Sequence, residues 1–326
     1  MDKIITANRR VLALDFDGVI WDTECEGYVV GQKVWREIFG RWAFCPMHIF
    51  TSGRWLARTG EEFALILLIG ERLCLEAAEA EYVTKTSGLK PISAEAMAAS
   101  FEYGALPAIL AGKAEQWSQG AEPWTKEAAS FPVEVSNINL QNYIWSDFIN
   151  EGNSLKHFLT FFGKRLAYWR AESRRQNMAS WLETQHIYKG NLETIQKALA
   201  IFDGVSICTT KDKASVEALL NTVGLKMLIL SKEHTFDKKL QLYILAASFG
   251  VEPEQILFVD DLLDNLLKVR PQGVNVALAG WGYNCVQSRA EAKKLDIPFV
   301  SSTTTFAFNR YSAKIMKQSP AQFFGL

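Results

Sequence analysis

From about residue 200 onward, short and fully apolar runs alternate with helical patterns, and this alternation limits the possible folds more than any other feature. Strands with one wet face alternate apolar and polar residues, whereas continuous apolar runs are typical of strands buried on both faces. Parallel strands joined by helices through right-handed crossovers form a doubly wound sheet. We therefore predict an α/β fold with a doubly wound parallel sheet as its core.

The individual elements follow one another in a regular order. Glycines at 224 and 250 end two of the helical patterns, as glycine commonly does after a helix. A further apolar run near the N-terminus, residues 11–14, predicts another strand of the same sheet. The predicted strands are 11–14, 205–208, 226–230, 256–259 and 274–278, and the predicted helices are 213–223, 238–249 and 262–269.

Polar residues stand where three of these strands end. In open α/β sheets, ligands bind at the carboxyl ends of the strands, so these residues are expected on one rim. Lys238, at the start of a predicted helix, joins them. The residues are Asp15 and Asp17 after strand 11–14, Thr209 and Thr210 after strand 205–208, and Asp260 and Asp261 after strand 256–259.

Carboxylates gathered on one rim repel one another unless a cation lies among them. All-oxygen ligands favour a hard cation, and Mg²⁺ suits a site with few carboxylates and a substrate phosphate. A carboxylate can then attack phosphorus, while an ammonium and a hydroxyl neutralise and bind the phosphoryl oxygens. The pattern predicts phosphoryl transfer.

Four segments resemble, in order, the motifs of the haloacid-dehalogenase-like (HAD) superfamily of hydrolases. Together they cover the first 22 and roughly the last 125 residues. Trp281-Gly-Tyr283 is also similar to a stretch common in that family. The four segments are Val11-Leu-Ala-Leu-Asp-Phe-Asp-Gly-Val-Ile20, Thr209 followed by Thr-Lys, Lys238 twelve residues before Gly250, and Phe258-Val-Asp-Asp-Leu-Leu-Asp-Asn265.

The resemblance implies catalytic roles. Asp15 would be the nucleophile and would carry an aspartyl phosphate. Asp17 would protonate the leaving oxygen and then activate water. Thr209 and Lys238 would hold the phosphoryl group, and Thr210 would contact the substrate. An aspartate at position 17 is typical of the family's phosphatases and phosphomutases, in contrast to its dehalogenases and phosphonatases.

The resemblance also implies a magnesium site. Its ligands would be Asp15, the backbone carbonyl of Asp17, and Asp261, with Asp260 helping directly or through water. The division of metal binding between the two neighbouring aspartates stays open, because many members have glycine and aspartate there. Lys239 stays open as an alternative to Lys238 for binding phosphate.

Residues 23–199 form an insertion between the first and second motifs. The core, residues 1–22 and 200–326, is expected to be HAD-like and Rossmannoid, and the insertion a mostly helical cap that selects the substrate. Arg54 and Arg58 of the insertion are candidates for binding an anionic substrate. A large cap favours a small phosphorylated metabolite over a polymer. Residues 77–135 resist assignment.

Several motifs have simpler interpretations. Asp17-Gly18 between apolar runs is also a hairpin signal, and Asp260-Asp261 could begin a helix as its N-cap. A group of basic and aromatic residues predicts either a solvated helix face or, less well, a nucleic-acid surface. This group consists of Lys164, Arg165, Tyr168, Trp169, Arg170, Arg174 and Arg175.

The remaining composition argues against several classes of protein. The formal net charge is −1, so no global field attracts nucleic acid or an anionic membrane. The longest apolar run, residues 63–69, is far below the roughly 20 residues that a membrane span needs. Five scattered cysteines predict neither disulfides nor a zinc site. We expect a cytoplasmic protein that binds neither nucleic acid nor membrane.

The sequence therefore predicts a Mg²⁺-dependent phosphatase of a small phosphorylated metabolite that acts through Asp15. Two alternatives remain, a phosphomutase with the same residues and a non-catalytic protein that keeps the fold. The substrate and the oligomeric state are not fixed by the sequence.

Overall fold

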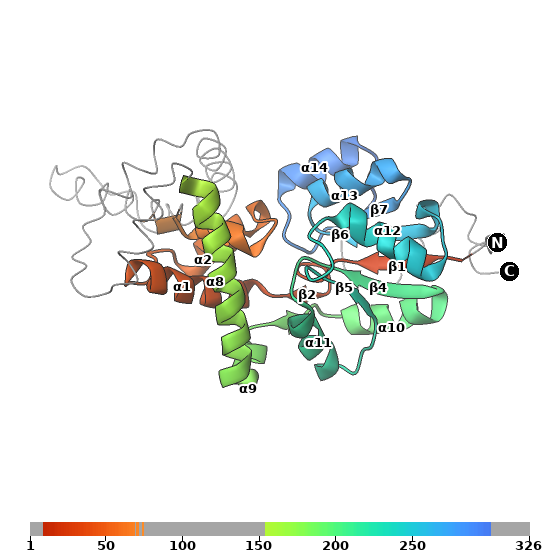
Figure 1. Cartoon of the computed structure of the whole chain (residues 1–326). Coiled ribbons are helices and arrows are strands. Elements are labelled where there is room, and N and C mark those ends of the chain that lie inside the picture. Colours follow the sequence, from red (N-terminus) through yellow and green to blue (C-terminus); the bar gives the residue numbers. More distant parts are fainter. Residues whose placement is uncertain (1–8, 69, 72–73, 75–153, 301–326) are drawn as a thin grey trace. The chain divides into compact units, whose positions relative to one another are not determined.

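The computed structural model describes residues 9–68, 70–71, 74 and 154–300 (Figure 1). The described residues up to Thr23 and from Leu182 onward form one compact unit, and those from Glu24 to Trp181 form another. We call them the core unit and the inserted unit and describe each by itself. Residues 77–135, to which the sequence assigned no structure, lie outside the described residues.

The core unit contains a six-stranded parallel sheet in the order β5-β4-β1-β6-β7-β8. β1 lies inside the sheet, where Leu14 pairs with Ile207 on one side and with Val259 on the other. The predicted doubly wound parallel sheet is thereby confirmed. The strands are β1 (Val11–Leu14), β4 (Gly204–Cys208), β5 (Leu228–Leu230), β6 (Ile256–Asp260), β7 (Asn275–Ala279) and β8 (Phe299–Val300).

Helices cover both faces of this sheet. Val11 and Ala13 belong to a buried cluster with Leu245 of α12 and Leu266 of α13. Because successive side chains of a strand point to opposite faces, the alternate residues of β1 face the other helix layer. Figure 1 shows α12, α13 and α14 on one side and α10 and α11 on the other. The helices are α10 (Asn191–Ile201), α11 (Lys213–Thr222), α12 (Lys238–Phe249), α13 (Leu263–Val269) and α14 (Val286–Lys294).

Local capping explains where the helices near the site begin and end. The carboxylate of Asp212 accepts a hydrogen bond from Ser215 N and caps α11, and Asp237 caps α12 by accepting from Lys239 N. Gly250 ends α12 in the left-handed region, with φ of 64°, which glycine adopts without strain. These caps fix α12 so that its first residue, Lys238, is buried.

A short antiparallel pair lies beside the main sheet. β2 (Trp21–Asp22) pairs with β3 (His186–Ile187), and Asn191 Nδ2 donates to the carbonyl oxygens of Val19 and Ile20 at 2.6 and 3.1 Å. These contacts tie residues 182–199 to the core unit. The second boundary therefore lies between residues 181 and 182, whereas the sequence interpretation placed it between 199 and 200.

Every regular element described within the inserted unit is helical. An apolar cluster that includes Trp35, Phe50 and Phe162 forms its core. Inside the same unit, Arg170 forms a two-fold ion pair with Glu26, with Nε–Oε1 at 2.6 Å and Nη2–Oε2 at 3.0 Å. The α-helices are α1 (Glu24–Phe39), α2 (Met47–Gly53) and α8 (Ser154–Gln176), and α9 (Met178–Glu183) runs from this unit into the next.

The basic residues of α8 contact carboxylates. Arg165 pairs with Glu37, and Arg175 pairs with Glu172 within the helix. Together with the Arg170 pair, these contacts balance much of the positive charge that the sequence places there. Arg170 is buried, so the group does not form a single solvated helix face. Among the described helices, none has the length and apolarity required to cross a membrane.

Candidate active site

The candidate site lies at the carboxyl ends of β1, β4 and β6. The chain builds the sheet outward from β1 through β4 to β5 and then returns to the other side of β1 with β6, so β1 marks the point where the strand order reverses. Ligands of doubly wound sheets bind at this point. Asp15 follows β1, Thr209 follows β4, and Asp260 is the last residue of β6.

Lys238 lies among the carboxylates of the site. Its Nζ donates to Asp15 Oδ1 at 2.7 Å and to the carbonyl oxygen of Cys208, and it lies 3.7 Å from Asp260 Oδ2. The lysine is 4% exposed, whereas the neighbouring Lys239 is exposed. Of the two lysines that the sequence left open, the structure brings Lys238 to the site.

Burial and mutual repulsion raise the pKa of two carboxylates of the site. Burial raises the pKa of Asp15, and the nearby Lys238 only partly opposes it. Burial and the charge of Asp15 raise the pKa of Asp260 to about 7. For Lys238, burial alone would lower the pKa, but the two carboxylates outweigh it and raise the pKa above its usual value. One ammonium is thus too little positive charge for this group of acids.

Three buried aspartates are placed to hold a metal ion. Ligand oxygens of Asp15, Asp260 and Asp261 all lie within 4.8 Å of one another. Asp260 is held by Leu262 N at 2.8 Å and Asn265 Nδ2 at 3.0 Å. The all-oxygen donor set and the excess of negative charge fit a hard divalent cation. The sequence interpretation gave Asn265 no role, although the residue ends the fourth motif.

The loop after β1 and the Trp281-Gly-Tyr283 stretch fit closely together. A Cβ at Gly18, where φ is 81°, would lie 2.1 Å from Asp261 Oδ2, and a Cβ at Gly282 would lie 2.2 Å from the Gly18 carbonyl oxygen. Tyr283 N donates to Asp261 Oδ2 at 2.5 Å. Both positions therefore require glycine, and their contact orients the Asp261 carboxylate.

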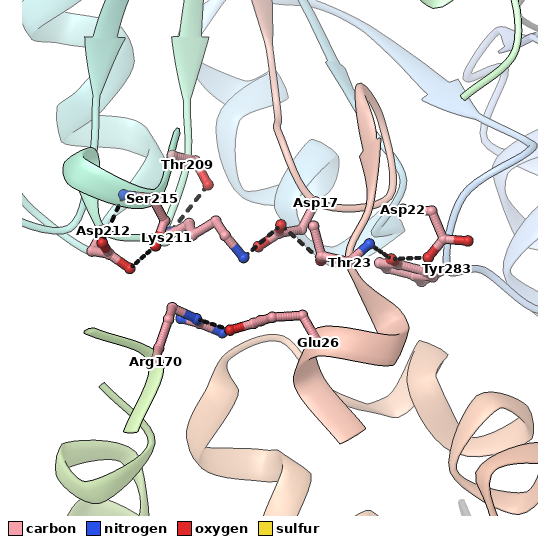
Figure 2. A network of polar contacts seen from close by, with 10 residues as sticks. All are labelled: Asp17, Asp22, Thr23, Glu26, Arg170, Thr209, Lys211, Asp212, Ser215 and Tyr283. Atoms are coloured by element: carbon pink, nitrogen blue, oxygen red, sulfur yellow. Dashed lines mark hydrogen bonds and ion pairs between the residues drawn. The ribbon is translucent and has the colours of Figure 1, made fainter. Parts of the chain in front are cut away.

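The hydroxyl of Tyr283 reaches the other end of the same loop. It donates to Asp22 Oδ1 at 2.9 Å and accepts from Thr23 N at 2.7 Å. Trp281 Nε1 donates to the Val19 carbonyl oxygen at 3.0 Å. The tryptophan-glycine-tyrosine stretch thus fixes the segment that carries Asp17, as Figure 2 shows for Tyr283.

Asp17 contacts one hydroxyl and one ammonium. Its Oδ1 accepts from Thr23 Oγ1 at 2.8 Å and lies 3.2 Å from the Nζ of Lys211 (Figure 2). Lys211 is buried, and its backbone N donates to Thr209 Oγ1 at 3.1 Å. Sequence reasoning did not assign Lys211 or Thr23. The signal for Lys211 was the Thr-Thr-Lys run itself, which places the lysine two residues after Thr209.

The other residues predicted to contact the substrate are Thr210 in the core unit and Arg54 and Arg58 in the inserted unit. Thr210 is half-buried and follows Thr209 in a bend. Arg54 and Arg58 belong to the inserted unit. The Nη1 of Arg54 donates to the Ala57 carbonyl oxygen at 2.9 Å, and its guanidinium lies 4.8 Å from the Phe63 ring centroid. Arg58 is exposed. A role for either arginine in binding substrate stays a prediction.

Two simpler interpretations of the motifs can also be compared with the structure. Asp260 ends β6, and the N-cap of α13 is Leu262 with no side-chain cap, so the aspartate pair is not the helix cap. The hairpin signal at Asp17-Gly18 corresponds to a turn but not to a hairpin, because β1 pairs in parallel with β4 and β6 and β2 pairs with β3. The turn and the placement of Asp17 at the site are compatible.

The raised pKa of Asp260 predicts how the stability of the metal-free protein depends on pH. Between about pH 4 and pH 7 the unfolded chain loses the proton at this position while the folded chain keeps it. A pKa raised by folding favours the folded state at low pH, so the free energy of unfolding should fall as the pH rises through this window. Urea unfolding in the presence of a chelator measures this dependence.

The Asp260→Asn variant is the control for this prediction. It cannot ionise, so its free energy of unfolding should fall less than that of the wild type over the same pH range. The difference between the two proteins removes the contribution of the titrating groups that do not interact with Asp260. Equal slopes for the two proteins would contradict the prediction.

No protein-family model and no curated protein sequence matches the chain. Solved structures do. A predicted phosphoglycolate phosphatase from Haemophilus somnus is 14% identical, with a TM-score of 0.50 over 94% of this chain and 99% of that one. A protein from Lactobacillus delbrueckii, also described as a predicted phosphoglycolate phosphatase, is 10% identical. Its TM-score is 0.50 over 94% of this chain and 97% of that one.

A haloacid dehalogenase-like protein of unknown function from Agrobacterium tumefaciens is 15% identical, with a TM-score of 0.46 over 94% of this chain and 99% of that one. At 10–14% identity, the likeness to the Haemophilus somnus and Lactobacillus delbrueckii structures shows the fold alone. The chain shares the doubly wound α/β fold of the Haemophilus somnus and Lactobacillus delbrueckii proteins, the fold class that the sequence predicted.

Proposed function

We propose that the protein is a Mg²⁺-dependent phosphatase that hydrolyses a small phosphorylated metabolite through an aspartyl phosphate on Asp15. One observation carries the proposal. Asp15 lies at the switch point of the sheet, paired with Lys238 and beside Asp260 and Asp261, while Asp17 is held separately two residues away. A nucleophile, a phosphate-binding cation, a metal site and an independent acid are what phosphoryl transfer requires.

The first step transfers the phosphoryl group to the protein. A carboxylate oxygen of Asp15 forms a bond to phosphorus, the bond from phosphorus to the leaving oxygen breaks, and Asp17 gives that oxygen a proton. Lys238 and the hydroxyl of Thr209, with Thr210 beside it, neutralise and orient the phosphoryl oxygens. Lys238 already contacts Asp15 and the Cys208 carbonyl, so it needs no reorganisation to act.

The second step frees the nucleophile. Asp17, now a carboxylate, takes a proton from water, the water oxygen bonds to phosphorus, and the Asp15 carboxylate departs as the leaving group. Inorganic phosphate is the product, and Asp17 is protonated again for the next cycle. A single residue thus serves as acid and then as base.

The carboxylates of the site would bind Mg²⁺, which would offset their negative charge. Asp15 and Asp261 would hold it, with the backbone carbonyl of Asp17 and the Asp260 carboxylate assisting. When bound, the ion supplies positive charge that reduces the repulsion between an anionic nucleophile and an anionic phosphoryl group. The clustering of three buried carboxylates, two of them beside the ammonium of Lys238, supports this assignment.

The inserted unit is the proposed substrate-selecting cap. Its exposed Arg58 suits an anionic metabolite, and the buried Arg54 supports the loop that carries it. We propose a cytoplasmic enzyme of metabolites that binds neither nucleic acid nor membranes, in keeping with the net charge of −1.

Phosphate release from a panel of phosphorylated metabolites tests this function, with Mg²⁺ and with excess chelator. We expect release from one chemical group of substrates, lost with the chelator and restored by added Mg²⁺. Chromatography of the same reactions detects an isomerised sugar phosphate, the product of a mutase. Release that is indifferent to the chelator, or none from a folded protein across the panel, would contradict the proposal.

A further inference from the structure

We propose that Lys211 is a positioning residue for Asp17, which holds one carboxylate oxygen so that the other faces the leaving group. This inference rests on the proposed phosphatase function and adds a residue to it. Two buried lysines then have separate roles in the site. Lys238 serves the nucleophile Asp15, and Lys211 serves the acid Asp17.

The placement of Lys211 is fixed by its surroundings. Its side chain is 0% exposed, and its Nζ lies 3.2 Å from Asp17 Oδ1. Its backbone is anchored on both sides, since its N donates to Thr209 Oγ1 at 3.1 Å and its carbonyl oxygen accepts from Lys232 N at 3.4 Å. The next residue, Asp212, caps α11. The ammonium therefore approaches Asp17 from a rigid segment of the chain.

A buried ammonium without a partner is costly, so the ion pair with Asp17 also accounts for the presence of a lysine here. The pair is asymmetric. The Asp17 side chain is 22% exposed, whereas the lysine has no exposure. The acid can therefore meet a substrate from solvent while the lysine stays behind it.

Thr23 holds the same oxygen from another direction. Its Oγ1 donates to Asp17 Oδ1 at 2.8 Å, and its own backbone N is tied to Tyr283 Oη at 2.7 Å. Figure 2 shows the lysine and the threonine on either side of the aspartate. A hydrogen bond and an ion pair on Oδ1 restrict rotation of the carboxylate, so Oδ2 is the oxygen that carries the transferred proton.

The dependence of kcat/KM on the leaving group distinguishes a residue that positions the acid from a residue that binds phosphate. An alkoxide is a poor leaving group and needs a well-placed proton, whereas p-nitrophenolate leaves without one. The ratio kcat/KM reports the steps up to phosphoryl transfer and is unaffected by the later hydrolysis, in which Asp17 also acts. Misplacing the acid should therefore lower kcat/KM for an alkyl phosphate alone.

The test compares Lys211→Met with wild type on a simple alkyl phosphate and on p-nitrophenyl phosphate. We expect kcat/KM to fall about 100-fold for the alkyl ester and to stay within about threefold for the aryl ester. Lys211→Arg, which keeps the charge, should recover part of the loss. Lys213→Met, an exposed lysine that pairs with Glu217 on the same helix, is the matched control and should behave as wild type.

Equal losses on both esters, or no loss on either, would overturn the role of Lys211 and leave the phosphatase function standing. A wild type that hydrolyses neither ester, nor any metabolite of the panel, overturns the function itself. A wild type that hydrolyses only the aryl ester lacks acid catalysis and also overturns the inference. If Lys211→Met does not fold, Thr23→Val replaces it, because this change keeps the backbone contact to Tyr283 and removes the second donor.

Discussion

Asp15→Asn should release phosphate at least about 10⁴-fold more slowly than the wild type, because an amide cannot form the aspartyl phosphate. The loss should appear in kcat/KM on the best substrate of the panel, measured with Mg²⁺. The fold should survive the change. Burial raises the pKa of Asp15, and in the variant Lys238 keeps Asp260 as an opposing charge, so a neutral group of the same shape at position 15 should not unfold the protein.

The matched control for this variant is Asp203→Asn. Asp203 is an exposed aspartate that precedes β4, at the edge of the sheet opposite the site, where its carboxylate accepts from Arg10 N. It should keep wild-type activity. If Asp15→Asn releases phosphate at the wild-type rate, either Asp15 is not the nucleophile or the activity belongs to a contaminant.

Lys238→Met should lose both stability and activity. Without the ammonium, the carboxylates of Asp15 and Asp260 remain buried without an opposing side-chain charge. Removing one partner of a buried pair costs about 3–5 kcal/mol, so the free energy of unfolding in chelator should fall by about that amount. Activity should fall at least about 100-fold, because the phosphoryl oxygens lose a fixed cation.

Mg²⁺ provides a second measurement on the same variant. A divalent ion at the three aspartates replaces part of the missing charge, so its stabilising effect should be larger for Lys238→Met than for the wild type. Lys239→Met is the control, because this neighbouring lysine is exposed. Wild-type activity in Lys238→Met together with a loss in Lys239→Met would reverse the assignment of the two lysines.

The elements around the site could be predicted because their limits are set locally. The apolar runs of β1, β4 and β6 end abruptly in polar residues, and the structure ends these strands within one residue of the prediction. The helix 238–249 coincides with α12 because Asp237 caps its start and Gly250 ends it. Since the carboxyl ends of parallel strands lie at the same edge of a sheet, the same pattern predicted which polar residues would lie close together.

Features that depend on distant contacts could not be predicted. β2 and β3 have two residues each, too few for a pattern, and they form only because the chain returns at residue 186. Lys211 looked like an ordinary lysine until the fold placed it beside Asp17. The hydroxyl of Tyr283 spans 260 positions to reach Thr23, and no local pattern contains such a pairing.

The position of β1 inside the sheet affects how the protein folds during its synthesis. β1 is made before the other strands of its sheet, yet it pairs with β4 and β6, and β6 begins 245 residues after β1. At about 5–20 residues per second, the ribosome needs roughly 10 to 50 seconds to supply that second neighbour. Until then this buried, fully apolar strand lacks one of its partners. The inserted unit, which ends at Trp181, is made before β6, so the core unit can complete its sheet only after the inserted unit has been synthesised.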